Sequence, residues 1–241
     1  MLSKNEIKDI QSLSHKKFRK ALKLFVAEGP KIVRELLDRM PQQFEKIYAL
    51  KEWLAQNSDA DLSKAIEINE AELEKISGLQ TPNQVVAIIR QPDAAAPAGD
   101  SLVLYLDTIQ DPGNLGTIIR TADWFGIRHI VCSEGCAELY NPKVIQSTMA
   151  SIARVNVFYD EDGGWLQNQQ LPVYAATLHG RPLETFTPLQ TGVLVIGNES
   201  KGISDEVLQF ATEQITISKK GHAESLNAAV ATGILLSHLV K

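Results

Sequence analysis

The sequence predicts an α/β protein with a parallel-sheet C-terminal domain and a small N-terminal α/β sandwich. From Ser101 onward, short β-branched runs alternate with apolar helical patterns, which is typical of a parallel sheet covered by helices on both faces. Before that point, residues 91–100 contain two prolines and a glycine and offer nothing to bury. We therefore expect a linker at 91–100 between domains at 1–90 and 101–241.

In residues 1–90 the elements follow from local signals. A Lys-rich start with helical patterning leads to a short strand at 24–27 and a turn at Gly29–Pro30. The next segment, 31–39, places Ile32, Val33, Leu36 and Leu37 on one helical face. Strands are then expected at 44–50 and 84–89, with an acidic stretch between them.

In residues 101–241 strands and helices alternate. Strands are expected at 102–106, 129–132, 155–159, 173–176, 193–196 and 215–217. A helix at 115–125 follows the first strand, and Asn141 and Pro142 mark the start of the second helix. Ser204 is expected to cap a short helix, and the last helix should run from Leu226 to about residue 240.

Composition excludes several classes of protein. The first residues lack the apolar core of a signal peptide, and no apolar run approaches the ~20 residues that a membrane span requires. Two cysteines make no disulfide framework, so we expect a cytoplasmic protein without membrane association. The five histidines show no metal-ligand spacing, so no metal site is expected.

Charge is unevenly distributed although the net charge is −5. Residues 1–24 hold seven basic residues against two acidic ones, whereas residues 51–100 hold four basic and nine acidic ones. A local basic face can dock phosphate on an acidic protein, and an ordinary solvated helix face is the alternative. The basic residues are Lys4, Lys8, Lys16, Lys17, Arg19, Lys20 and Lys23.

Three loops rich in Gly and Asn carry the functional signal. They cover residues 111–120, 194–204 and 215–227, and each follows an expected strand and precedes an expected helix. Loops at the carboxyl ends of strands are where open α/β sheets bind ligands. The dinucleotide fingerprint, the P-loop and the nucleophile elbow are all absent from them.

Together the three loops resemble the signature motifs of the SpoU (TrmH-type) branch of the SPOUT RNA methyltransferases. The first motif is matched by Asn114, Gly116 and Arg120, the second by Gly197, Glu199 and Gly202, and the third by Gly221, Ser225, Leu226 and Asn227. Residues 1–90 resemble the ribosomal-protein-like substrate-binding domain that precedes the catalytic domain in many members.

The resemblance implies transfer of a methyl group from S-adenosylmethionine to a ribose 2′-hydroxyl of a structured RNA, either tRNA or rRNA. It further implies a deep trefoil knot, a homodimer whose active site borrows from both subunits, and no metal ion. The implied catalytic residues are Arg120, Asn114, Glu199, Ser225 and Asn227. The implied cofactor-binding residues are Thr177, Leu178, Gly197, Ile217 and Leu226.

One segment departs from the family pattern. The third motif commonly carries Ile-Pro-Met after its strand, whereas this chain has Ser218 and Lys219 in place of Pro-Met, followed by Lys220. Main-chain contacts to a cofactor survive such a change, and the two added cations are also suited to RNA phosphate.

The chemistry of Arg120 can be examined separately. A guanidinium keeps its proton under ordinary conditions, so stabilising a developing alkoxide or holding a neighbouring phosphate suits it better than acting as a general base. Two alternatives stay open: a non-catalytic RNA-binding module, and an α/β enzyme with another nucleotide cofactor. The target RNA, its nucleotide and its base are not specified by the motifs.

Each residue of the set also has a purely structural interpretation. Asn114 suits a turn or a helix cap, and Glu199 suits a solvated loop position. Ser225 suits the N-cap of the last helix, with Asn227 in its first turn.

Overall fold

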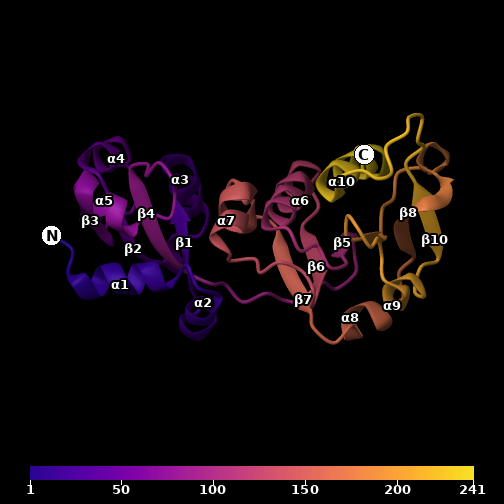
Figure 1. The fold of residues 1–241 in the computed structure, drawn as a ribbon, viewed down its shortest axis with the longest axis horizontal. Helices are drawn as coiled ribbons and strands as arrows, with labels where there is room; N and C mark the ends of the chain where they lie inside the picture. The colour runs from indigo at the N-terminus through magenta and orange to yellow at the C-terminus, as the bar shows by residue number, and fades with distance from the viewer. The chain divides into compact units, whose positions relative to one another are not determined.

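The computed structural model describes residues 1–241, which form two compact units (Figure 1). The first unit contains Met1–Asp93 and Glu138–Ala153, and the second contains Ala94–Ala137 and Arg154–Lys241. No helix in either unit is long and apolar enough to cross a membrane.

The first unit is a four-stranded sheet between two layers of helices. Its sheet has the order β1-β4-β2-β3, in which β4 is antiparallel to both of its neighbours. Its elements are α1 (Lys4–Ser12), α2 (Lys16–Leu22), β1 (Leu24–Glu28), α3 (Pro30–Arg39), the 3₁₀ turn η1 (Pro41–Gln43), β2 (Phe44–Ala49), α4 (Lys51–Gln56), β3 (Ala65–Glu67), α5 (Glu70–Ile76), β4 (Val85–Arg90), α7 (Pro142–Thr148) and the 3₁₀ turn η2 (Ser151–Ala153).

Alternation along the strands builds the two faces of this sheet, because successive strand residues point to opposite sides. Phe25 and Ile89 pack on the face covered by α3, α4 and α7. Val26 and Ile88 pack on the other face, which α1 and α5 cover. The predicted α/β sandwich therefore has a core on each side of its sheet.

The structure differs from the predicted domain division at Glu138–Ala153, which packs in the first unit. Ile145 of α7 is buried in the first unit's core, and the Tyr140 ring lies 4.9 Å from that of Phe25. Arg19, which is 2% exposed, donates to the Glu138 carboxylate. The apolar side chains of this segment complete the core beside β1, which the order of elements along the chain does not reveal.

The acidic stretch before β4 contains three elements that the sequence analysis did not specify, α4, β3 and α5. Asn69 caps α5, since its side chain accepts from the Glu72 amide at 3.0 Å while the Glu72 carboxylate accepts from the Asn69 amide at 3.2 Å. This capping box is visible in the sequence as Asn-x-x-Glu before an apolar pair.

The second unit is a six-stranded parallel sheet in the order β10-β8-β9-β5-β6-β7. Every residue of the adjacent strands β5 and β9 is buried, as expected for central strands of a parallel sheet. Its elements are β5 (Leu102–Leu106), α6 (Pro112–Trp124), β6 (His129–Ser133), β7 (Asn156–Asp160), α8 (Gly164–Gln167), β8 (Val173–Pro182), the 3₁₀ turn η3 (Leu183–Thr185), β9 (Gly192–Ile196), α9 (Asp205–Leu208), β10 (Glu213–Thr216) and α10 (Ala228–Leu239).

Strand β8 is longer than the expected strand at 173–176, and its pairing with β10 is interrupted. Gln214 pairs with Ala175, but the next residue, Ile215, pairs with Arg181. Residues 176–180 therefore have no pairing partners in β10 and bulge out of the regular ladder. A side chain on Gly180 would place its Cβ 2.4 Å from the Gln214 carbonyl carbon, so only glycine fits at the end of this bulge.

The expected linker at 91–100 contains no helix or strand. Part of it is fixed to the second unit, because the Pro97 carbonyl accepts from Trp165 Nε1 at 3.1 Å and the Ala95 carbonyl accepts from Asn156 Nδ2 at 2.8 Å. Ala95 and Pro97 are therefore held against the second unit by hydrogen bonds.

Candidate active site

All three motif loops begin where strands of the second unit end. The first connects β5 to α6, the second follows β9, and the third connects β10 to α10. The Asp111 carboxylate caps α6 by accepting from the Asn114 amide at 2.8 Å. The cap places Asn114 in the first turn of α6, at the carboxyl end of the sheet.

Side-chain hydrogen bonds join the three motifs at Asn114. Its amide nitrogen donates to the Glu199 carboxylate, and its amide oxygen accepts from Asn227 Nδ2 at 2.9 Å. These partners lie 85 and 113 residues away along the chain. Asn114 therefore uses both ends of its amide to connect the loops after β5, β9 and β10.

Asn227 has a second role as the N-cap of α10. Its Oδ1 accepts from the backbone amides of Ala229 at 3.0 Å and Val230 at 3.3 Å. The last helix thus begins at Ala228 and not at Leu226 as expected, and the cap is Asn227 and not Ser225. The capping bonds fix the side chain that reaches Asn114.

The loop after β9 is a tight turn held by Asn198. Its Oδ1 accepts from the Ser200 amide at 2.9 Å, and its Nδ2 donates to the Thr108 carbonyl at 2.8 Å. A Cβ on Gly197 would lie 2.4 Å from the Gly202 carbonyl carbon, so the two sides of the turn touch through their backbones. This contact explains why Gly197 and Gly202 belong to one motif.

Asp107 is a site residue that the sequence analysis missed. It follows β5, is 1% exposed, and accepts from the Ser204 amide at 2.7 Å and from the Ser133 hydroxyl at 3.4 Å. The carboxylate thereby joins the ends of β5, β6 and the loop after β9. An acidic residue directly after the buried run 102–106 is the signal that could have revealed it.

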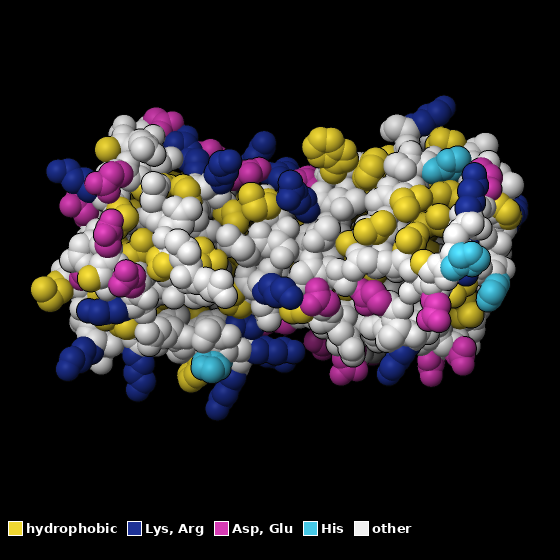
Figure 2. Space-filling model, turned by 45° about the horizontal axis from the view of Figure 1, so that its top comes forward, with side chains coloured by type: hydrophobic (Ala, Val, Ile, Leu, Met, Phe, Trp, Pro, Cys, Tyr) yellow, Lys and Arg dark blue, Asp and Glu magenta, His cyan; other side chains and the backbone are white.

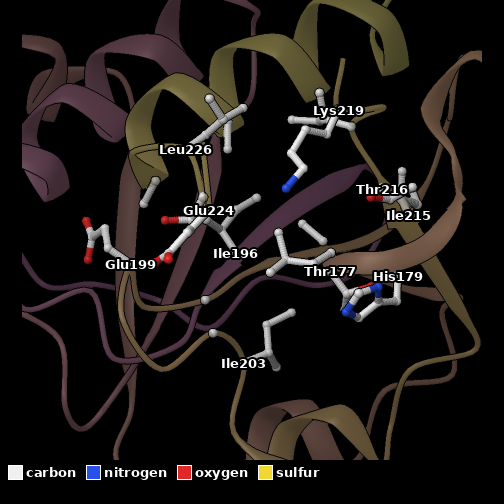
Figure 3. Close-up of a pocket in the computed structure, with 18 of the residues that line it drawn as sticks. Thr177, His179, Ile196, Glu199, Ile203, Ile215, Thr216, Lys219, Glu224 and Leu226 are labelled. Atoms are coloured by element: carbon white, nitrogen blue, oxygen red, sulfur yellow. The ribbon is translucent and has the colours of Figure 1, made fainter. Parts of the chain in front are cut away.

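The ends of these strands enclose a cavity of about 1020 Å³ (Figure 3). The bulge of β8, the loop after β9, and the loop and helix after β10 line it. Apolar walls come from Ile196, Ile215 and Leu226, which Figure 3 shows around the space. Of the predicted site residues, the cavity is lined by Thr177, Leu178, Gly197, Glu199, Ile217, Ser225 and Leu226.

The segment that departs from the family pattern forms the outer wall of the cavity. The Ser218 hydroxyl donates to the Glu184 carboxylate at 2.7 Å, and this hydrogen bond holds the pKa of that carboxyl below its usual value. Lys219, the next residue, projects from the loop into the cavity (Figure 3).

Arg120 does not line the cavity. It lies on the exposed face of α6, which also carries Trp124, whose side chain is 84% exposed. Helix α10 packs beside α6 and exposes Val230 and Ile234. The structure therefore brings together four of the five predicted catalytic residues around the cavity or its hydrogen-bonded edge and leaves Arg120 apart from them.

The described residues contain no group of three or more His, Cys, Asp or Glu side chains placed to hold a metal ion. Both cysteines are free thiols.

Comparison with known proteins identifies a matching family for each of the two parts of the chain. Residues 101–237 match the SpoU rRNA Methylase family, and residues 4–87 match the MRM3-like substrate binding domain. The 23S rRNA (guanosine(2553)-2′-O)-methyltransferase RlmP of Bacillus subtilis is 32% identical over 98% of this chain and 97% of its own length.

Solved structures agree with this placement. A protein from Porphyromonas gingivalis assigned to the TrmH family of RNA methyltransferases superposes with a TM-score of 0.88 at 38% identity, covering 98% of this chain and 97% of its own. An AdoMet-bound rRNA methyltransferase from Sinorhizobium meliloti superposes with a TM-score of 0.84 at 29% identity, covering 98% and 94%. The chain therefore belongs to the SpoU rRNA methylase family.

Proposed function

We propose that this protein transfers a methyl group from S-adenosylmethionine to a ribose 2′-hydroxyl of ribosomal RNA. The observation that carries the proposal is the meeting of the three motif loops at one cavity through Asn114, Glu199 and Asn227. The choice of rRNA over tRNA rests on the B. subtilis relative, which matches over nearly the whole of both chains and is a 23S rRNA methyltransferase.

The cavity fits the methyl donor. Its volume of about 1020 Å³ lies at the upper end of ordinary small-molecule sites, which leaves room for a nucleoside and an amino-acid side arm. Apolar walls at Ile196, Ile215 and Leu226 suit an adenine ring, and main-chain groups at Gly197 and Ile217 suit its polar edge. Thr177 and Leu178, on the bulge of β8, complete the proposed donor site.

The residues of the chain have separate tasks in the proposed reaction. Bound donor supplies a sulfonium methyl group for in-line displacement by the ribose oxygen, a reaction that requires no metal ion. Glu199, Asn114 and Asn227 hold one another in place at the cavity edge, with Ser225 on the adjoining loop, and so orient the incoming ribose. Arg120 stabilises negative charge developing on the ribose oxygen, since a planar guanidinium can donate to that oxygen and to a neighbouring phosphate together.

Arg120 reaches a cavity in this proposal through a homodimer. The exposed face formed by Trp124 of α6 and by Val230 and Ile234 of α10 is apolar, and Figure 2 shows hydrophobic side chains gathered over these two helices. We propose that the same face of a second copy of the chain packs against it, because exposed apolar patches on a protein surface typically mark interfaces. Arg120 lies on the same face of α6 and would enter the cavity of the partner.

Three further features complete the proposal. Residues 1–90 act as the RNA-binding domain and 101–241 as the catalytic domain, joined by the linker at 91–100. The loops after β9 and β10 form a deep trefoil knot, a proposal that rests on the match of residues 101–237 to the SpoU family. The reaction takes place in the cytoplasm, which suits a protein with two free cysteines.

Nucleoside mass spectrometry tests the proposed activity. The full-length protein is incubated with 23S rRNA or large ribosomal subunits and isotope-labelled donor, and the RNA is digested. We expect one labelled 2′-O-methylnucleoside, which is absent when Asn114→Ala replaces the wild-type protein. Donor binding without methylated nucleoside would instead identify an RNA-binding module without turnover, and absence of donor binding would identify another cofactor.

A further inference from the structure

Lys219 places an unpaired positive charge in the cavity. It extends from the loop after β10, and its ammonium group is directed into the space bounded by Ile196, Thr177 and Leu226 (Figure 3). No carboxylate forms an ion pair with it, and no acceptor forms a hydrogen bond with it. A free ammonium beside apolar walls is a site for an anionic ligand group.

The neighbouring residues of this loop, Ser218 and Lys220, act on the Glu184 carboxylate. Ser218 donates to Glu184 at 2.7 Å, and Lys220 lies close enough to the same carboxylate to contribute to the lowering of its pKa. The hydrogen bond from Ser218 holds the loop directly before Lys219. Lys220 also lines the cavity, but its charge acts on Glu184, whereas the ammonium of Lys219 is directed into the space.

Glu224 supplies the opposite charge. It lines the same cavity from the later part of the loop, and it too has no ion pair or hydrogen bond in the structure (Figure 3). The cavity therefore offers the Lys219 cation and the Glu224 carboxylate to the same ligand, and Lys201 and Lys220 add further positive charge to its lining. A zwitterionic amino-acid group is the chemistry that satisfies both.

We propose that Lys219 binds the carboxylate, and Glu224 the ammonium, of the amino-acid end of S-adenosylmethionine. The proposal rests on the proposed function and adds residues that determine how the donor is recognised. Both side chains are exposed at the cavity mouth in the free protein, so each can pair with a charged ligand group without first breaking another contact. Lys219 and Glu224 thereby position the sulfonium between the adenosine subsite and the edge at Glu199.

Binding calorimetry with three ligands separates the two contacts. S-adenosylmethionine carries both charged groups, its decarboxylated form keeps only the ammonium, and 5′-methylthioadenosine lacks both. We expect Lys219→Met to weaken S-adenosylmethionine by about tenfold and to leave the other two unchanged. We expect Glu224→Gln to weaken S-adenosylmethionine and its decarboxylated form by a similar factor and to leave 5′-methylthioadenosine unchanged.

Lys220→Met is the matched control, because it removes the same charge from a lining residue whose charge acts on Glu184, and it should change the three affinities much less than Lys219→Met does. Equal weakening of all three ligands by Lys219→Met, or unchanged affinity for S-adenosylmethionine, would overturn the proposal. A loss of RNA binding with unchanged donor binding would overturn it as well and assign Lys219 to phosphate. If the wild-type protein bound none of the three ligands, the proposed function itself would fail.

Discussion

At the scale of single residues, the site depends on an amide that donates and accepts at once. Asn114 donates to Glu199 from its amide nitrogen and accepts from Asn227 at its amide oxygen, so the two bonds use separate atoms of one planar group. Aspartate has the same shape but lacks the donor. It would also place a second negative charge against Glu199.

We therefore expect Asn114→Asp to lower the methyl-transfer rate by ~10²–10³ and the free energy of unfolding by about 1–3 kcal/mol. Single-turnover kinetics and urea unfolding measure the two effects. The double variant Asn114→Asp/Glu199→Gln restores a donor opposite the carboxylate, so it should be more stable than Asn114→Asp alone. Equal stability of the single and double variants would mean that the Asn114–Glu199 contact does not matter.

Residues of the site differed in how far the sequence could predict them. The family motifs predicted Asn114, Glu199 and Asn227 because these are the polar positions that meet in space, and the cavity also contains the predicted Thr177 and Leu178. The motifs could not predict the exposed position of Arg120. A helix of known sequence does not reveal which of its faces stays uncovered until its neighbours are known.

At the scale of elements, helix α2 supplies most of the positive charge of the proposed RNA-binding surface. Lys16, Lys17, Lys20 and Lys23 are exposed on or beside this helix, and Phe18, which is 42% exposed, stands among them. Figure 2 shows cations gathered along this edge of the first unit. Arg19 is the exception in the predicted basic set, because it is buried against Glu138 and serves the fold.

Reversing the charge of Lys16, Lys17, Lys20 and Lys23 to Glu should weaken RNA binding and reduce its salt dependence. If all four contact phosphate, the magnitude of the slope of log affinity against log salt should fall by about 3. Each phosphate contact that is lost removes the counterion release that this contact contributes on binding. Fluorescence anisotropy across a range of KCl concentrations measures the slope. The control is the double variant Lys31→Glu/Lys51→Glu, on α3 and α4, which should leave the slope unchanged. An unchanged slope in the four-residue variant would mean that α2 is an ordinary solvated helix that does not contact RNA.

Most elements followed from periodicity, and the exceptions have physical reasons. Strand β5 was predicted at its observed bounds, since a continuous apolar run in an α/β pattern is a buried strand. The extension of β8 could not be predicted, because Arg181 and Pro182 pair with β10 through backbone and not through apolar side chains. The packing of segment Glu138–Ala153 in the first unit could not be predicted, because it depends on how its apolar face fits that unit's core.

At the scale of the whole molecule, the proposed dimer makes each active site a joint structure. Arg120→Ala and Asn114→Ala should each inactivate the homodimer. In a mixed dimer, however, the Arg120→Ala subunit keeps an intact cavity and receives Arg120 from its partner. After subunit exchange of equal amounts, we expect about one quarter of wild-type activity, because half of the dimers are mixed and each has one complete site.

The control for this experiment is Trp124→Glu, added to both variants. A charge at the centre of the apolar face should give monomers in analytical ultracentrifugation and abolish the recovery. Recovery that persists in monomers, or no recovery in stable mixed dimers, would contradict an Arg120 that acts in the partner's cavity.

The long-range contacts of the second unit also bear on how the chain acquires its structure over time. Parallel neighbours such as Leu102 and Gly192 must meet across a long loop, and the bond from Asn114 to Asn227 closes a longer one. Such topologies fold slowly, because loop-closure entropy is lost before the contacts form. The proposed donor cavity includes residues from Ala176 to Leu235, so on this proposal a growing chain has no donor site until α10 has been synthesised and packed. Donor can then slow unfolding of the finished protein, but it cannot accelerate the search that leads to it.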